Sequence, residues 1–212
     1  MNYTDLKYIY QSSGKKDAYT LLLLHGTGGD ETDLLSIAAK FGNDINVLSL
    51  RGNVSEAGMP RFFKRLGMGV FDEKDLTFRT HEMVAFIKQL SIKENFNAEK
   101  IIALGYSNGA NIAGSTLFLY PDFFAGAILY RPMQPFKSID ENVKSLKHTP
   151  VFMSNGTADP TINPEDTKTY ISHLKNAGYN VAAFSLQTGH NLTLRDIEIS
   201  VQWFNENFTP NS

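Results

Sequence analysis

A serine in a glycine-bounded turn is the side chain of this sequence best placed to act as a nucleophile. Ser107 lies between Gly105 and Gly109 in a stretch of the form G-x-S-x-G. The apolar run at residues 101–104 predicts a buried strand before it, and residues 108–120 predict a helix after it. A strand, a sharp turn and a helix around this motif are typical of a nucleophile elbow, whose glycines let strand and helix approach closely. An ordinary glycine-rich loop is the alternative.

An acid and a base follow the serine, each shortly after a predicted strand. Asp159 follows a strand at residues 150–154, and His190 follows the last predicted strand, residues 180–186. A histidine can take a proton from a serine hydroxyl near neutral pH. Asp159 is a candidate for the acid that orients the histidine. Because it precedes a proline, the alternative is that its side chain only forms an Asx turn. The order serine, acid, histidine is that of α/β-hydrolases and favours a catalytic triad of Ser107, Asp159 and His190.

A second glycine-rich stretch, from His25 to Gly29, follows the predicted central strand at residues 18–24. Small residues there leave backbone N–H groups free to face a nucleophile, and the residue after the serine supplies a second N–H. We therefore expect the amides of Thr27 and Asn108 to form an oxyanion hole. A phosphate-binding loop is the alternative, but the sequence has neither a P-loop motif nor G-x-G-x-x-G. His25 itself is expected to have a structural role.

These residues must be positioned by strands that alternate with helices. Strands are expected at residues 3–11, 18–24, 45–50, 101–104, 125–130, 150–154 and 180–186, and helices at residues 31–41, 73–95, 108–120, 163–178 and 192–208. The last helix is expected to pack on the sheet through Leu194, Ile197, Val201, Trp203 and Phe204. This alternation predicts an α/β fold, the α/β-hydrolase fold, with a mostly parallel central sheet and helices on both faces. Residues 1–212 are expected to form a single domain.

Residues 51–72 show no regular period. Glycines and a proline interrupt the segment, yet large apolar side chains are frequent in it. A loop of about 20 residues inside a compact domain is uncommon and often functional. The segment is therefore interpreted either as a cap over the active site or as a connection whose aromatic residues fill a satellite core. In the first case the substrate pocket is expected to include Met59, Phe62, Phe63, Met68 and Phe71.

The composition excludes several classes of function. The chain has 212 residues, a net charge of −2 and no cysteine, which excludes a thiol nucleophile, disulfides and cysteine-based metal sites. Neither the charge nor any basic run indicates nucleic acid as a partner. The most apolar run, residues 21–24, is too short to cross a bilayer, and the first residues lack the features of a signal peptide. No stable membrane insertion, a cytoplasmic location, no metal and no cofactor are expected.

Four stretches together resemble the phospholipase/carboxylesterase family of α/β-hydrolases, which includes acyl-protein thioesterases. They are L-H-G-T-G-G-D at residues 24–30, G-Y-S-N-G-A at 105–110, G-T-A-D-P at 156–160 and G-H at 189–190. The resemblance implies a metal-free hydrolase of carboxylic esters or thioesters, with Ser107, Asp159 and His190 as its triad. Asn108 and Ala110 depart from the glutamine and glycine that are usual in the family. The backbone amide of Asn108 is unaffected by this change.

The stretches at residues 51–53, 59–63 and 131–133 resemble a bacterial subgroup associated with resistance to hydroquinone-type compounds. The expected function is hydrolysis of esters or thioesters of small or medium apolar acyl or aromatic substrates through an acyl-enzyme intermediate. Two alternatives stay open on the same scaffold: a non-ester hydrolase and a ligand-binding protein for quinone-like aromatics. The expected partner is a small-molecule ester or thioester. A homodimer is also open, since several members of the family form dimers.

Overall fold

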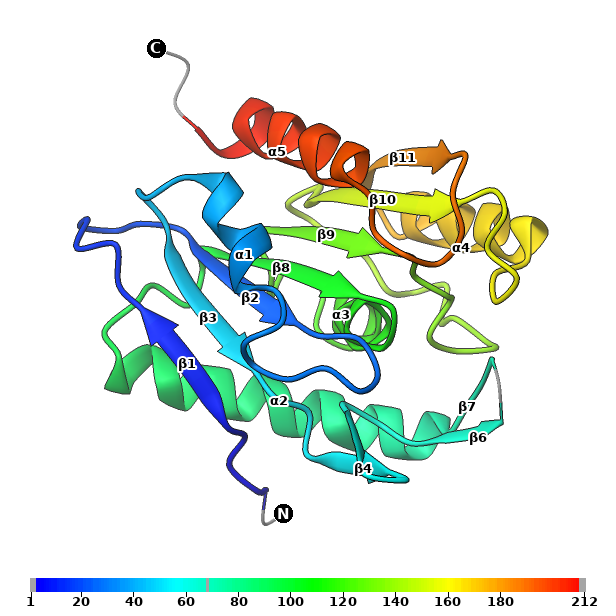
Figure 1. Cartoon of the computed structure of the whole chain (residues 1–212), viewed down its shortest axis with the longest axis horizontal. Helices are drawn as coiled ribbons and strands as arrows, with labels where there is room; N and C mark the ends of the chain where they lie inside the picture. Colours follow the sequence, from blue (N-terminus) through cyan, green and yellow to red (C-terminus); the bar gives the residue numbers. More distant parts are fainter. Residues whose placement is uncertain (1–2, 68, 210–212) are drawn as a thin grey trace.

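Seven strands form one central sheet in the computed structural model, which describes residues 3–67 and 69–209 (Figure 1). The strands, in their order across the sheet, are β1 (Tyr8–Gln11), β3 (Asn46–Leu50), β2 (Thr20–Leu24), β8 (Ile101–Tyr106), β9 (Gly126–Tyr130), β10 (Pro150–Gly156) and β11 (Asn180–Leu186). Only β1, at one edge, runs antiparallel to its neighbour among the strands of this sheet. The predicted mostly parallel sheet is therefore confirmed, and the carboxyl ends of its parallel strands meet at one edge.

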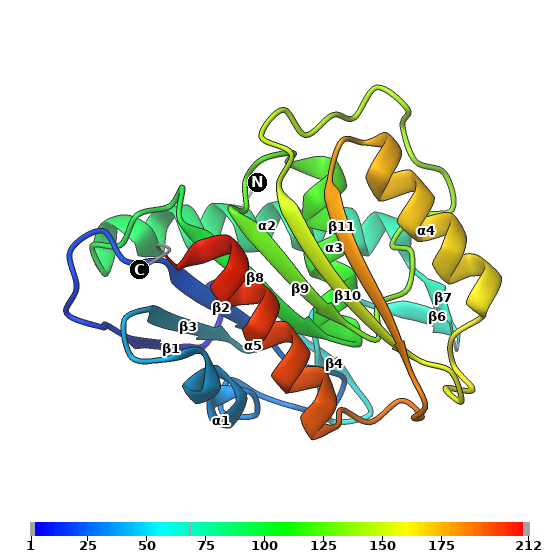
Figure 2. The ribbon, with the colours of Figure 1, turned by 90° about the horizontal axis from the view of Figure 1, so that it is seen from above.

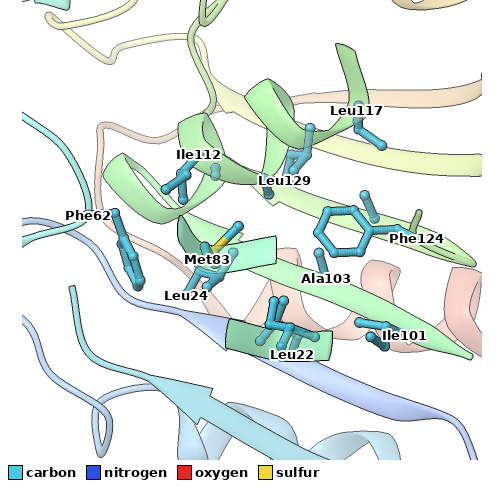
Figure 3. Packing of buried hydrophobic residues seen from close by; sticks show 14 of the residues in the cluster. Leu22, Leu24, Phe62, Met83, Ile101, Ala103, Ile112, Leu117, Phe124 and Leu129 are labelled. Carbon is cyan, nitrogen blue, oxygen red and sulfur yellow. The ribbon is translucent and has the colours of Figure 1, made fainter. Parts of the chain in front are cut away.

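Helices cover both faces of the sheet, as predicted (Figure 2). Helices α2 (Glu73–Lys93), α3 (Asn108–Leu119) and α4 (Pro164–Asn176) lie on one face, and α1 (Leu35–Ala38), the 3-10 helix η1 (Ala39–Phe41) and α5 (Leu194–Phe208) lie on the other. Side chains of β2 alternate between the two faces. Leu22 and Leu24 join the core beneath α2 and α3, part of which Figure 3 shows. Leu21 and Leu23 join the core beneath α1 and α5.

Helix α1 is much shorter than the helix predicted over residues 31–41. Turns occupy residues 31–34, and the helix begins only at Leu35. The Asp30 carboxylate accepts from the N–H and the hydroxyl of Thr32 at 2.8 and 2.6 Å. This Asx turn gives the backbone a local alternative to the helical hydrogen bonds, which explains the late start.

Residues 51–72 contain regular structure that was not predicted. Two short antiparallel ribbons occupy most of the segment: β4 (Val54–Glu56) with β5 (Met59–Arg61), and β6 (Arg65–Gly67) with β7 (Val70–Phe71). Ala57 and Gly58 form the first turn with φ values of 50° and 82°. Positive φ at both central residues is the geometry of a tight hairpin turn. Alanine rarely adopts it, so this turn is difficult to predict from the residue types.

Helix α5 buries a partly different face from the one that its apolar residues predict. Trp203 and Phe204 are buried as expected, but Leu194 is 76 % exposed. Asp196 is fully buried instead, because its carboxylate pairs with the guanidinium of Arg131. Within the described ranges, no helix of the chain is long and apolar enough to span a membrane.

Candidate active site

Ser107, His190 and Asp159 come together at the carboxyl ends of three parallel strands. Ser107 follows β8, Asp159 follows β10 and His190 follows β11. The Nε2 atom of His190 lies 2.9 Å from Ser107 Oγ, and its Nδ1 atom lies 2.7 Å from Asp159 Oδ2. Because the carboxylate can only accept, Nδ1 carries the proton and Nε2 is left to accept from the serine hydroxyl. The three side chains form one hydrogen-bonded chain from carboxylate to hydroxyl.

The backbone at Ser107 is strained, and its neighbouring glycines make room for it. Ser107 has φ 52° and ψ −111°, in a region that non-glycine residues rarely adopt. A Cβ atom on Gly109 would lie 1.9 Å from the carbonyl oxygen of Leu24. One on Gly105 would lie 2.6 Å from the backbone nitrogen of Ala110. Both glycines are therefore required sterically where the strand turns into α3.

The two oxygens of Asp159 make different contacts. Oδ2 faces His190, while Oδ1 accepts from the N–H and the hydroxyl of Thr161 at 2.9 and 2.7 Å. Burial raises the pKa of Asp159, but the hydrogen bonds from Thr161 and His190 outweigh it and hold the pKa below its ordinary value. The Asx turn and the contact with histidine, considered as alternatives from the sequence, are thus both present. Thr161 was not identified from the sequence, although it stands where an Asx turn places its donor.

Thr27 and Asn108 lie beside the serine, as expected. Both residues line the same cavity as Ser107. Within the described part of the chain, neither backbone N–H has a hydrogen-bond acceptor, whereas the adjacent N–H of Gly28 donates to Pro60 O at 2.9 Å. Two unpaired amides near a nucleophile are suited to stabilising an anion that develops there.

His25 holds the glycine-rich loop in place. Its Nε2 accepts from the N–H of Gly52 at 3.0 Å, so Nδ1 carries the proton and donates to Gly26 O at 2.6 Å. The ring is buried and lies 4.7 Å from the ring of Phe62, centroid to centroid. Burial lowers the pKa of His25, which favours the neutral ring that these contacts require. The structural role expected for His25 agrees with these contacts.

The candidate site opens into a cavity of about 250 Å³. Of the five predicted pocket residues, Phe71 lines it. Phe62 and Phe63 do not, because both are buried in the core, where Phe63 packs edge-on against Phe71 at 5.1 Å between ring centroids. Met59 does not line it either; it is 41 % exposed and lies beside the glycine-rich loop. Met68 lies outside the described residues. The predicted apolar pocket is therefore wrong for Met59, Phe62 and Phe63.

Comparison with known proteins places this geometry in a family. A family model described as phospholipase/carboxylesterase matches residues 7–205. The chain belongs to the phospholipase/carboxylesterase family. The resemblance carried by the four sequence stretches is thereby confirmed.

Relatives in this family cover nearly the whole chain. The putative hydrolase MhqD of Bacillus subtilis is 43% identical over 201 residues, which are 95% of this chain and 98% of MhqD. The solved carboxylesterase of Bacillus cereus is 41% identical with a TM-score of 0.92, over 96% of this chain and 95% of that one. The structure of YahD with malic acid is 29% identical with a TM-score of 0.88, over 95% and 99%. The chain is thus a carboxylesterase-type hydrolase with the α/β-hydrolase fold.

An arginine that was not identified as a site residue holds the loop around His190. Arg131, fully buried at the end of β9, donates to the backbone oxygens of Gly189 and Asn191 at 3.2 and 3.0 Å. Its Nη1 and Nη2 atoms also bind the two oxygens of Asp196 at 2.7 and 2.8 Å. The sequence offers one sign of this arrangement: Asp196 is three residues after Thr193, the spacing of a capping box at the start of α5. Nothing in the sequence indicates its partner.

Two further arginines that were not identified line the cavity. Arg61 comes from β5 and Arg65 from β6. The Nη1 atom of Arg61 donates to the hydroxyl of Thr27 at 2.7 Å, and its Nε donates to Phe63 O at 3.1 Å. Arg61 therefore fixes the loop that carries one of the two unpaired amides.

Proposed function

We propose that this chain is a serine hydrolase that cleaves carboxylic esters or thioesters of small substrates through an acyl-enzyme intermediate. The observation that carries the proposal is the contact of His190 with both Ser107 Oγ and the Asp159 carboxylate. The chain's membership of the phospholipase/carboxylesterase family supports it. A nucleophile, a base and a group that orients the base are the elements of covalent acyl transfer.

In the first half of the reaction, Ser107 Oγ attacks the acyl carbon while Nε2 of His190 takes the hydroxyl proton. The N–H groups of Thr27 and Asn108 donate to the oxygen that becomes negatively charged. The carbon–oxygen or carbon–sulfur bond then breaks, and His190 returns its proton to the leaving group. Asp159 remains ionised throughout and stabilises the charged imidazole. This agrees with the pKa of Asp159, which burial raises but hydrogen bonds hold below its ordinary value.

In the second half, water attacks the acyl-enzyme with His190 again as the base. The acid product leaves, and the proton returns to Ser107. The same two amides donate to the second oxyanion. The substrate, one water molecule and these residues together account for every bond and proton in the cycle.

The cavity supports small rather than long-chain substrates. Phe71, Tyr106 and Met133 supply its large apolar surfaces. An adjoining cavity of about 200 Å³ shares Gly69 and Met133 with it, which provides space for a second substituent of the ester. We expect activity to peak at short or medium acyl chains.

Hydrolysis of p-nitrophenyl esters from acetyl to palmitoyl tests the proposal, with Ser107→Ala as the control. Removal of a triad nucleophile lowers kcat by on the order of a million-fold in a comparable enzyme. A fluorophosphonate should label Ser107 in the wild type and nothing at that position in the variant. If the wild type neither turns over any ester above the variant nor reacts with the probe, the proposal is wrong. A ligand-binding role or a non-ester bond would then take its place.

Two further predictions from the sequence, the cellular location and the oligomeric state, are kept as proposals. A cytoplasmic location is expected from the composition of the chain, and a homodimer from the behaviour of other family members. Sedimentation velocity over a range of protein concentrations would measure the oligomeric state.

A further inference from the structure

The two edge strands of the central sheet differ in how their free edges are protected. An edge strand presents unpaired N–H and C=O groups, which proteins usually guard by short length, charged side chains, proline or a bulge. Strand β1 has four residues, and the ammonium group of Lys93 lies against it, where it donates to the hydroxyl of Tyr8 at 2.7 Å. Strand β11 has seven residues, N-V-A-A-F-S-L, with no charge and no proline, and it pairs in register with β10 over all seven. The β11 edge is thus long and uncharged, and the β1 edge is not.

Three residues of β11 direct their backbone groups away from the sheet. The N–H of Asn180 donates to Thr149 O at 3.2 Å, and Leu186 O accepts from the N–H of Thr157 at 2.8 Å, so both end residues face β10. Backbone groups of successive residues alternate between the two edges of a strand, so every second residue between these ends faces outward. In the described part of the chain, the N–H and C=O groups of these outward residues have no hydrogen-bond partner. The outward residues are Val181, Ala183 and Ser185.

The middle of this edge is open to solvent. Ala183, Phe184 and Ser185 are all exposed. The ring of Phe184 stacks on Phe152 at 5.1 Å between ring centroids, yet Phe184 is still 39% exposed. Helices α4 and α5 lie on the two faces of the sheet (Figure 2), but they leave these three residues uncovered. An open strand edge of this kind can accept another strand.

We propose that a second copy of this chain pairs with β11, strand against strand and antiparallel, about a twofold axis at Ala183. The three outward residues are symmetric about Ala183, so each copy offers the other the same donors and acceptors, as a twofold contact requires. Ala183 pairs with Ala183 of the partner subunit, and Val181 pairs with Ser185 of the partner subunit. The two central sheets then form one continuous sheet. This inference does not depend on the reaction proposed above.

The side chains of β11 fit the same twofold pairing. Ala182 and Leu186 pack against the core beneath α5, and Phe184 lies on that face with them. In the antiparallel register Phe184 stands directly opposite Ala182 of the partner subunit, at a position where facing side chains approach closely. The large ring therefore lies over a small methyl group, and the pairing covers the ring that a single chain leaves exposed. Cross-strand contacts of this kind stabilise a sheet.

Helix α4 adds complementary charge beside the strand. It contacts β11 and carries Glu165 and Asp166 in its first turn and Lys175 in its last turn. Because α4 connects two parallel strands, it runs opposite to β11, and the twofold axis sets the two copies of α4 antiparallel. The acidic first turn of each helix is then directed toward the basic last turn of the other. Such complementarity favours this orientation of the two copies.

Charge substitutions at the proposed axis test this surface by sedimentation velocity over a range of protein concentrations. The wild type should show an equilibrium between monomer and dimer. Ala183→Lys and Ala183→Glu each place two like charges opposite each other, so each should raise the dissociation constant of the dimer about fivefold or more. A mixture of the two variants in equal amounts should restore the dimer, because the introduced charges are then opposite. Ala183 is exposed, so both variants should keep the circular dichroism spectrum of the wild type.

Ile92 provides the matched control. It lies at the end of α2, is 84% exposed and is next to Lys93, which contacts the opposite edge of the sheet. Ile92→Lys should leave the dissociation constant unchanged. Ala183→Cys introduces a thiol into a chain without cysteine, and mild oxidation should join two copies by a disulfide. Paired residues of this kind lie about 5.5 Å apart at Cα, within the range that a disulfide spans. The same treatment of Ile92→Cys should give no covalent dimer.

Three results would overturn the inference. The first is a wild type that stays monomeric throughout the concentration range. The second is a dimer that persists unchanged in both Ala183→Lys and Ala183→Glu, which would place the contact on another surface. The third is a mixture of these two variants that stays monomeric, which would exclude a twofold axis at Ala183. Ester hydrolysis is measured separately, so none of these results bears on the proposed function.

Discussion

Two groups of arginines border the same cavity, and they differ in how their charge is compensated. The side chains of Arg131 and Asp196 are both completely buried and bind each other at two points. Arg61 and Arg65 share Glu56, whose side chain is 34% exposed. A charge that is balanced and enclosed can only hold other parts of the protein in position. A pair whose carboxylate is partly exposed is screened by solvent more strongly than an enclosed pair.

The buried pair is stable because every part of it is hydrogen-bonded. Burying an ion pair costs desolvation energy that additional hydrogen bonds must offset. Arg131 donates to Ser154 in addition to the loop around His190, and the Asp196 carboxylate also accepts from Ser154 and Thr193. These contacts join β9, β10, the start of α5 and the loop of the base. The pair is thus a positioning device for His190.

The largest difference between the two groups should be seen in stability. Arg131→Met leaves the Asp196 carboxylate buried without its cation, and breaking a buried pair in this way costs about 3–5 kcal/mol. Arg65→Gln affects a partly exposed contact and should leave the melting temperature close to that of the wild type. Urea unfolding of both variants would measure the difference. Equal losses of stability would show that the distinction between the two groups is wrong.

The second difference should be kinetic. Arg131→Lys keeps the charge but loses the planar fork, so the loop of His190 is held less firmly. A misplacement of the base by about 1 Å lowers the rate by as much as 100-fold. We expect kcat to fall while KM changes little, and to fall equally for p-nitrophenyl esters of different acyl length. A rise in KM with kcat unchanged in Arg131→Lys would instead show that Arg131 binds substrate.

The same contrast explains how much of the site could be predicted from the sequence. Ser107, Asp159 and His190 follow strands whose apolar runs are easily recognised, and their order in the chain is informative by itself. The structure brings these three side chains together. Their supports were not found, because Arg131 and Asp196 are 65 residues apart, and the capping-box spacing of Thr193 and Asp196 does not indicate which cation pairs with the carboxylate.

The pocket was predicted wrongly for a related reason. The sequence shows that the segment from residue 51 to residue 72 is rich in aromatic residues, but it does not show which way they point. Two short ribbons turn Phe62 and Phe63 into the core and leave Arg61 and Arg65 at the cavity. The density of apolar residues did not separate the buried Phe62 and Phe63 from the exposed Met59, and it did not indicate which residues line the site. The first ribbon turns at Ala57 with a positive φ, a conformation that alanine rarely adopts.

The smallest expected difference concerns stability at low pH. Burial raises the pKa of Asp196, but hydrogen bonds from Arg131, Ser154 and Thr193 outweigh it, so the pKa lies below its ordinary value. Its contribution to stability is therefore complete above the unfolded value of about 3.9 and is lost as the pH falls through the lower, folded value. Asp196→Asn should make the free energy of unfolding less dependent on pH below about 4, by at most about 1.4 kcal/mol per pH unit, the effect of one proton.

Salt should separate this effect from the corresponding one at Glu56. The hydrogen bond from Arg65 lowers the pKa of Glu56 and exceeds the opposing effect of burial, so Glu56→Gln should change the pH dependence in the same direction. The Debye length falls to about 3 Å at 1 M salt, which weakens exposed ion pairs far more than enclosed ones. At that salt concentration the effect of Glu56→Gln should disappear, while the effect of Asp196→Asn persists. If both effects respond equally to salt, then the Arg131 pair is no better enclosed in solution than the pair at the cavity, and its role in fixing His190 loses its physical basis.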